Sequence, residues 1–234
     1  MRVRLPEALI KELDALMERM RHGEVEERQA VVARLTDYER SGTIPLEALI
    51  EMADEDDPTA AMYAVGALGR SQQPAAVNKL LALAGQYRER HPMFTETVVD
   101  ALGEAGDKAA TKVLLDFLGV KRGWRGSLLG LLGKFRKKQA TEQEKAFRAY
   151  IVLPAIRALA KLADRRAAEA LGQYLNHEDP LVRWHAIQGI VKCGRTEFIP
   201  RLERMGSNDS AELIREAARI AVQSMQTPPP EFVN

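Results

Sequence analysis

The chain has 234 residues, of which 46% are hydrophobic and 29% charged, a balance typical of a folded globular protein. The single cysteine, Cys193, excludes a disulfide framework and any multi-cysteine zinc or iron–sulfur site. Since 34 Lys+Arg nearly cancel 33 Asp+Glu, the chain as a whole has no strong electrostatic attraction to nucleic acid or membrane. No apolar run approaches the ~20 residues of a membrane span, and the N-terminal stretch lacks a signal-peptide pattern, so the sequence predicts a cytoplasmic protein with no membrane contact.

Four segments of the chain align without gaps and share one pattern of small and apolar residues. They are residues 58–69, 92–103, 180–191 and 212–223. The first two start 34 residues apart and the last two 32 residues apart. A proline leads the first three, which suits the first position of a helix because its missing N–H is not needed there. One column holds only small residues, which would let a second helix approach closely; its members are Ala67, Ala101, Gly189 and Ala221.

Each of the first three segments is followed by a second amphipathic stretch, so the repeating unit is predicted to be a helix–turn–helix of about 30–35 residues. Weaker copies at residues 25–35 and 150–163 bring the total to about six units. Pro154 interrupts one of these copies and predicts a kink or a helix start. We expect one repeat domain over residues 1–226, and a flexible tail over residues 227–234 because three consecutive prolines cannot continue a helix.

Aspartates stand immediately before two of the leading prolines. Asp57 precedes Pro58 and Asp179 precedes Pro180. A carboxylate at this position accepts hydrogen bonds from the first free N–H groups of the helix and suits its positive end. Both residues are therefore predicted to cap the helices that follow them.

Residues 175–194, LNHEDPLVRWHAIQGIVKCG, resemble HEAT repeats, and most of all the short phycobilin-lyase-type subclass with the pattern D-P-x-V-R-x-x-A-x-x-A-L-G. The resemblance extends over most of residues 5–225. It implies an all-α, right-handed α-solenoid of about six repeats. It also implies that Arg183 and its counterpart Arg215 reach an acidic turn residue and brace the stack, with a role in ligand binding as the alternative.

Proteins of this family are mostly scaffolds and binding surfaces, so the resemblance implies a non-catalytic protein-interaction scaffold or adaptor with a protein partner that the sequence does not identify. No phosphate-binding loop, hydrolase motif or metal-binding motif is present in the sequence, and neither a cofactor nor a metal is predicted. Cys193, which no histidine is placed to activate, is interpreted as a buried packing residue. A subunit related to bilin lyases is a minor alternative that only the subclass name suggests.

In HEAT solenoids one row of helices lines a concave surface on which partners lie. The alignment predicts which side chains point there: Met62, Arg70, Glu96, Asp100, Glu104, Arg157, Lys161, Trp184, Gln188 and Lys192. The three acidic members would form a stripe beside a basic strip of Arg157, Lys161 and Lys192, unless these charges only form a solvated helix surface. Trp184 and Met62 are candidate anchors for a partner, and packing against a neighbouring helix is the alternative.

An insertion at residues 119–149 breaks the repeat. Its residues 121–138 carry seven basic side chains and no acidic one, so the remainder of this +1 chain has a net charge of −6. Either the insertion is a packing helix with solvated ends, or it binds anionic ligands such as nucleic acid or phosphate groups. The residues of the binding hypothesis are Lys121, Arg122, Trp124, Arg125, Lys134, Arg136, Lys137 and Lys138.

Overall fold

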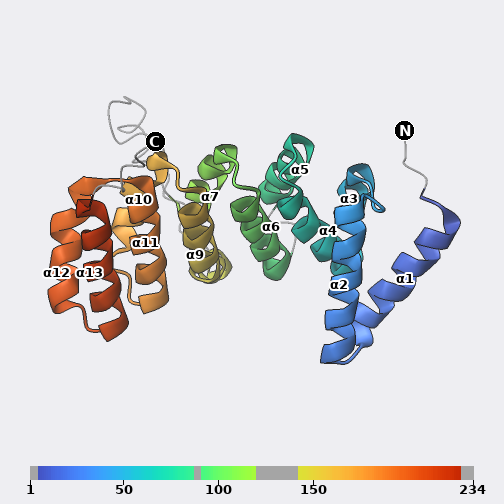
Figure 1. The fold of residues 1–234 in the computed structure, drawn as a ribbon, viewed down its shortest axis with the longest axis horizontal. Coiled ribbons are helices and arrows are strands. Elements are labelled where there is room, and N and C mark those ends of the chain that lie inside the picture. The colour runs from blue at the N-terminus through green and yellow to red at the C-terminus, as the bar shows by residue number, and fades with distance from the viewer. Residues whose placement is uncertain (1–4, 87–90, 120–141, 228–234) are drawn as a thin grey trace, which may run out of the picture. The chain divides into compact units, whose positions relative to one another are not determined.

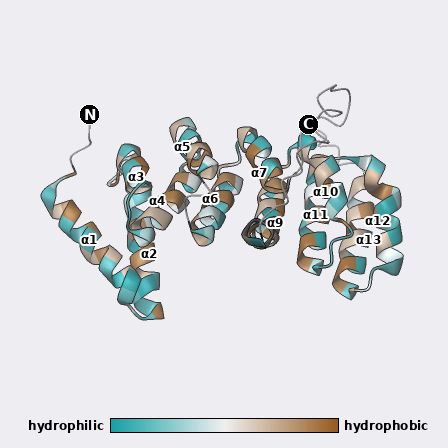
Figure 2. Cartoon of the chain, turned by 180° about the vertical axis from the view of Figure 1, so that it is seen from behind, coloured by the Kyte–Doolittle hydropathy of each residue, from teal (hydrophilic) through white to brown (hydrophobic). Residues whose placement is uncertain are grey.

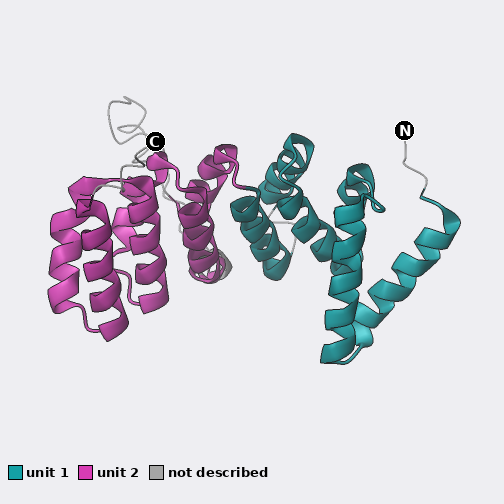
Figure 3. Cartoon of the chain, in the orientation of Figure 1, with its two compact units in different colours: residues 1–105 teal, residues 106–234 magenta. Residues whose placement is uncertain are grey.

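The computed structural model describes residues 5–86, 91–119 and 142–227, and no strand occurs among them. The chain divides into two compact units, residues 1–105 (unit 1) and residues 106–234 (unit 2), which Figure 3 distinguishes by colour. Helices stand side by side within each unit (Figure 1). The predicted all-α class is thereby confirmed.

Unit 1 is built from three successive helical pairs. Its helices are α1 (Glu7–His22), α2 (Val25–Ser41), α3 (Leu46–Met52), α4 (Pro58–Ser71), α5 (Pro74–Gly85) and α6 (Pro92–Ala105). α4 packs against α3, α5 and α6. The core between these helices contains Leu68, Leu80 and Leu102, whose side chains are all inaccessible to solvent.

Unit 2 continues the same scheme with short 3-10 turns before three of its helices. Its elements are η1 (Lys108–Ala110), α7 (Thr111–Phe117), α9 (Glu142–Leu162), η3 (Arg165–Ala167), α10 (Ala168–Tyr174), α11 (Pro180–Cys193), η4 (Thr196–Phe198), α12 (Ile199–Asn208) and α13 (Glu212–Gln226). α11 packs against α9, α10 and α13, and α12 packs against α13. Hydrophobic and hydrophilic residues occupy different faces of these helices (Figure 2), as expected for helices that bury one stripe.

Neighbouring helices meet at the predicted column of small residues. Ala67 and Ala101 are each 2% exposed, and Gly189 is buried. A Cβ added to Gly69 would lie 2.8 Å from the Cα of Ala101, so the backbones of α4 and α6 are nearly in contact. A Cβ on Gly189 would lie 3.2 Å from the Cα of Ala160, so α11 also approaches α9 closely. The prediction that these positions form buried seams is confirmed.

Pro154 lies inside α9, which begins at Glu142, so of the two predicted alternatives, a kink or a helix start, the helix start is excluded. Residues 142–149 of the predicted insertion accordingly belong to this helix. Proline removes one hydrogen bond of the helix. The helix nevertheless continues because Ile151 and Ala155, on either side of the proline, are fully buried, and their packing offsets the lost bond.

The buried residue Asp164 forms hydrogen bonds with α7, with α11 and with the turn before α10. Asp164 is 4% exposed, and its Oδ2 accepts hydrogen bonds from Thr111 Oγ1 at 2.7 Å and from Arg166 Nε at 2.7 Å. Its backbone oxygen accepts a hydrogen bond from Cys193 Sγ at 3.2 Å. The hydrogen bonds from Arg166, with a smaller contribution from Thr111, lower the pKa of Asp164 to about 2. The sequence analysis did not select Asp164, which links α7 and α11 through the turn before α10.

The Gly69–Ala101 seam makes a prediction about stability. Gly69→Ala should destabilise unit 1, because the added methyl group overlaps the backbone of Ala101 and overpacking costs about 1–3 kcal/mol. The higher helix propensity of alanine relative to glycine offsets at most ~1 kcal/mol of this loss. Thermal and urea unfolding followed by circular dichroism would measure the change.

Gly66→Ala is the matched control on the same helix. A Cβ there meets only the end of the flexible Arg70 side chain, at 3.4 Å, so this substitution should stabilise the protein by up to ~1 kcal/mol. Equal stability changes in the two variants would show that α4 and α6 are not in close contact.

Asp164→Asn should lower the free energy of unfolding by about 2 kcal/mol at neutral pH. The folded-state pKa of Asp164 lies below the unfolded value, so its charge stabilises the fold above the unfolded pKa, and this contribution is lost as the pH falls toward 2. The stability difference between wild type and variant should therefore shrink between about pH 5 and pH 2. Urea unfolding at a series of pH values measures it.

Asp107→Asn serves as the control, because Asp107 is an exposed cap of η1 and asparagine caps helices about as well as aspartate. It should change stability little across the same range. A loss in Asp164→Asn that stayed constant with pH would contradict the electrostatic role of Asp164.

Candidate functional site

Unit 1 presents its predicted surface residues on α4 and α6. Met62, Glu96 and Asp100 are half-buried, whereas Arg70 and Glu104 are exposed. Arg70 forms a two-point ion pair with Glu39 of α2, with Nη2 to Oε1 at 2.7 Å and Nε to Oε2 at 3.0 Å. This pair raises the pKa of Arg70 and holds its guanidinium against α2.

Unit 2 presents the other predicted surface residues on α9 and α11. Arg157, Trp184 and Gln188 are half-buried, and Lys161 and Lys192 are exposed. None of these five side chains belongs to the core, and their role on a partner-binding surface stays a prediction.

His185 lies among these residues and was not selected from the sequence. Its ring meets the ring of Trp184 edge to face, with centroids 4.7 Å apart. Burial lowers the pKa of His185, and the positive charges of Arg157, Lys161 and Lys192 lower it further. Burial and these neighbouring charges therefore both favour the neutral form of His185.

An apolar groove of about 350 Å³ runs between α11 and α13. Trp184 and Val191 line it from α11, and Leu213 and Ile220 from α13. Leu213 is 58% exposed and Ile220 56% exposed, and these two large apolar side chains, seven residues apart on α13, line the same groove. We call this feature the α11–α13 groove; its complete lining is Trp184, Gln188, Val191, Leu213, Glu216, Ala217, Ile220, Ala221 and Ser224.

The residues contributed by α13 were missed in the sequence analysis, although the repeat contained the signal. The last two aligned segments start 32 residues apart, so Trp184, Gln188 and Lys192 correspond to Glu216, Ile220 and Ser224. All three of these α13 residues line the groove. The last repeat lacks the Asp-Pro dipeptide, and the predicted surface column was not extended into it.

The two predicted capping aspartates occupy the N-caps of α4 and α11. Asp57 Oδ1 accepts a hydrogen bond from Thr59 N at 3.0 Å, and Asp179 Oδ1 accepts one from Leu181 N at 2.8 Å. Asp57 also pairs with Arg21 of α1, and this hydrogen bond is the main reason that the pKa of Asp57 is lowered. Asp57 thus connects α1 to the start of α4.

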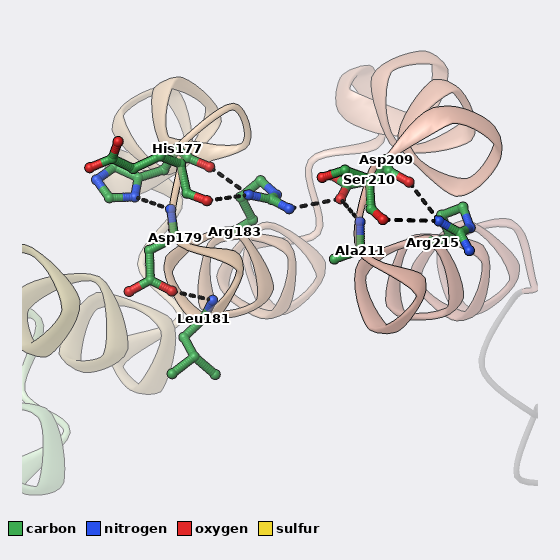
Figure 4. Close-up of polar contacts among 9 residues, drawn as sticks. His177, Asp179, Leu181, Arg183, Asp209, Ser210, Ala211 and Arg215 are labelled. Carbon is green, nitrogen blue, oxygen red and sulfur yellow. Dashed lines mark hydrogen bonds and ion pairs between the residues drawn. The ribbon is translucent and has the colours of Figure 1, made fainter.

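Arg183 connects the turns of the last two repeats (Figure 4). Its Nη2 donates to Asp209 Oδ1 at 2.8 Å, and its Nη1 donates to the carbonyl oxygens of His177 and Glu178 at 2.7 and 2.8 Å. Arg215 instead donates to backbone oxygens, those of Asp209 at 2.7 Å and Ser210 at 3.4 Å. Arg183 reaches an acidic turn residue, whereas Arg215 reaches only the main chain of the same turn.

The basic insertion residues Lys121, Arg122, Trp124, Arg125, Lys134, Arg136, Lys137 and Lys138 lie outside the described residues, as does the tail from residue 228. Their roles remain predictions.

The chemical groups of the described part offer few reactive candidates. Cys193 is 3% exposed, and burial raises the pKa of its thiol, so it is held in the weakly nucleophilic protonated form. No group of three or more potential metal ligands occurs among the described residues. No helix in the described ranges is long and apolar enough to span a membrane. The cytoplasmic location stays a prediction.

Comparison with known proteins gives a consistent picture. A solved structure, the complex of CpcE and CpcF of phycocyanin lyase from Nostoc sp. PCC7120, matches with a TM-score of 0.58 and 20% sequence identity, over 80% of this chain and 66% of that chain. A designed armadillo repeat protein, YIII(Dq)4CqI, matches with a TM-score of 0.42 and 14% identity, over 90% of this chain and 98% of that chain. The chain thus spans just under two thirds of the length of the lyase chain, and at 20% identity this likeness shows the fold alone. Among curated proteins none matches the sequence.

The family model for HEAT repeats matches residues 46–127 and 136–223, which together make up well over half of the chain. The resemblance noted at residues 175–194 is therefore confirmed, as is the predicted all-α solenoid class, and the chain belongs to the HEAT-repeat family.

Proposed function

We propose that this protein is a non-catalytic protein-interaction module, and that unit 2 binds a segment of a partner protein in the α11–α13 groove. The observation that carries the proposal is the exposure of Leu213 and Ile220 beside Trp184 in a groove with apolar walls. Burying exposed apolar area is the main favourable contribution to protein association, at roughly 25 cal/mol per Å².

The shape of the groove favours one kind of occupant. Its volume of about 350 Å³ suits a bulky apolar side chain presented by a partner, with Trp184 among the lining residues. Gln188, Glu216 and Ser224 supply polar groups to its lining. We expect the partner segment to bring one large apolar anchor flanked by polar residues.

Two observations argue for binding rather than catalysis at this surface. The histidine nearest to the groove, His185, has a lowered pKa caused by burial and by the three cations near it, and its ring packs on Trp184. The cysteine of α11, Cys193, is buried and donates its Sγ hydrogen to a backbone oxygen. Neither group is presented to a substrate as an activated nucleophile.

A bilin-lyase-like subunit remains the minor alternative. It is supported by the structural neighbour, whose name describes a phycocyanin lyase, and by the short repeat pattern at residues 175–194. The hypothesis requires covalent transfer of a pigment to an acceptor protein in the presence of the chain. Binding of anionic ligands by residues 121–138 also stays a proposal.

Ile220→Glu should abolish partner binding through the groove, because a carboxylate would have to be desolvated against apolar walls. The position is 56% exposed, and glutamate is a good helix former, so the fold should be unaffected. Affinity purification of wild type and variant from the native host, with quantitative mass spectrometry, should show at least one protein depleted tenfold or more with the variant. Its affinity for the purified wild-type chain then follows by calorimetry.

Val32→Glu provides the matched control, since Val32 is a 52% exposed apolar residue on α2 of unit 1. This variant should retain every partner that Ile220→Glu loses. If both variants capture the same proteins as wild type, the groove is not the docking site.

A further inference from the structure

A second, polar pocket of about 580 Å³ lies in unit 2, at the turns that join α10 to α11 and α12 to α13. Its lining comprises Leu175, Asn176, His177, Glu178, Arg183, Arg201, Arg204, Met205, Asn208, Asp209 and Ser210. It shares no residue with the α11–α13 groove. The family resemblance, the groove and the proposed docking function leave this pocket unexplained.

Two arginines of α12 face the pocket without a partner. Arg201 and Arg204 are three residues apart and therefore lie on one side of the helix. Arg201 is half-buried and Arg204 exposed, and neither forms an ion pair or a side-chain hydrogen bond with any described residue. A guanidinium group carries five N–H donors in a planar arrangement that matches carboxylate and phosphate oxygens.

The third arginine of the pocket is buried and incompletely satisfied. The side chain of Arg183 is 9% exposed, and both of its terminal nitrogens donate hydrogen bonds, but its Nε has no partner in the structure. A buried N–H without an acceptor is costly and uncommon. Arg183 thus places a buried guanidinium group, paired with Asp209, in the wall of the pocket.

The acidic groups of the lining neutralise only part of this positive charge, because Asp209 pairs with Arg183 and not with the arginines of α12. Asp209 is engaged: its Oδ1 accepts hydrogen bonds from Arg183 Nη2 at 2.8 Å and from Ala211 N at 2.9 Å. Glu178 is the other carboxylate, and its side chain is exposed. With three guanidinium groups against two carboxylates, the pocket keeps a net positive charge.

We propose that this pocket binds a phosphate monoester group, with Arg201 and Arg204 as its principal ligands and the Arg183 wall behind them. A phosphate monoester carries nearly two negative charges and three terminal oxygens, which suits two adjacent guanidinium groups better than the single charge of a carboxylate. The pocket exceeds the volume of one phosphate group, so it has room for the organic body to which the group is attached.

The phosphate monoester has two possible sources, a free small molecule or a phosphorylated side chain of a protein. Calorimetric titrations of the full chain with O-phospho-L-serine, with a short alanine-flanked phosphoserine peptide and with the unphosphorylated peptide distinguish them. We expect one or both phosphorylated probes to bind, with an affinity that falls as salt is added, and the unphosphorylated peptide not to bind. Binding of the amino acid identifies a small-molecule site, and binding of the phosphopeptide alone identifies a protein-derived ligand.

The variant Arg201→Ala/Arg204→Ala should weaken binding of the phosphorylated probe by about tenfold or more, because it removes two charge-assisted hydrogen-bonding groups. Lys112→Ala/Arg165→Ala is the matched control; it removes two exposed cations of unit 2 that do not line the pocket. The control should bind like wild type, and both double variants should keep the helical circular dichroism spectrum of the parent.

Glu178→Gln tests the same pocket through a variant that should strengthen, not weaken, the binding of the phosphorylated probe. Removing this carboxylate from the lining should tighten binding by roughly threefold. The proposal is overturned if neither phosphorylated probe binds the wild-type chain, or if both double variants weaken binding equally.

Discussion

The close approach of neighbouring helices at a column of small residues is the constraint on which the rest of the structure depends. Gly69 lies against the backbone of Ala101, and Gly189 lies against Ala160. A larger side chain at either glycine would push two helices apart, and dispersion and burial along the whole seam would weaken. Because this contact fixes the rotation of each helix, it also determines which side chains face outward, among them Trp184 and Ile220.

Much of the fold follows from patterns within single helices, and these were readable in the sequence. The aligned segments 58–69 and 92–103 lie within α4 and α6, and the small-residue column correctly marked the buried seams. The exclusion of a helix start at Pro154 has a physical cause. The local penalty of proline in a helix is about 3 kcal/mol, and the burial of neighbours such as Ile151 outweighs it. That contribution depends on tertiary packing, which a local sequence pattern does not contain.

The candidate sites were less predictable, because they depend on distances between elements. The alignment of the repeats selected Trp184 and Gln188 as surface residues. Extending the same alignment by one repeat would have selected Ile220 as well. These residues enclose a groove because α11 packs on α13. The pattern of a single helix does not contain this information about which helices pack together. The polar pocket is harder still to predict from the sequence, since its lining combines Arg201 with residues of a turn more than twenty positions earlier in the chain.

The contact between Arg183 and Asp209 explains how unit 2 keeps two chemically different surfaces. Asp209 accepts a hydrogen bond from Ala211, the residue at the N-cap of α13, so it fixes where that helix begins. The start of α13 in turn sets the direction of Leu213 and Ile220 in the groove. Arg183 anchors the same aspartate from α11 while forming one wall of the polar pocket. One buried ion pair therefore positions an apolar surface and a cationic one. Because the two surfaces share no lining residue, a substitution outside this pair, at Arg201 or at Ile220, can alter one of them without changing the other.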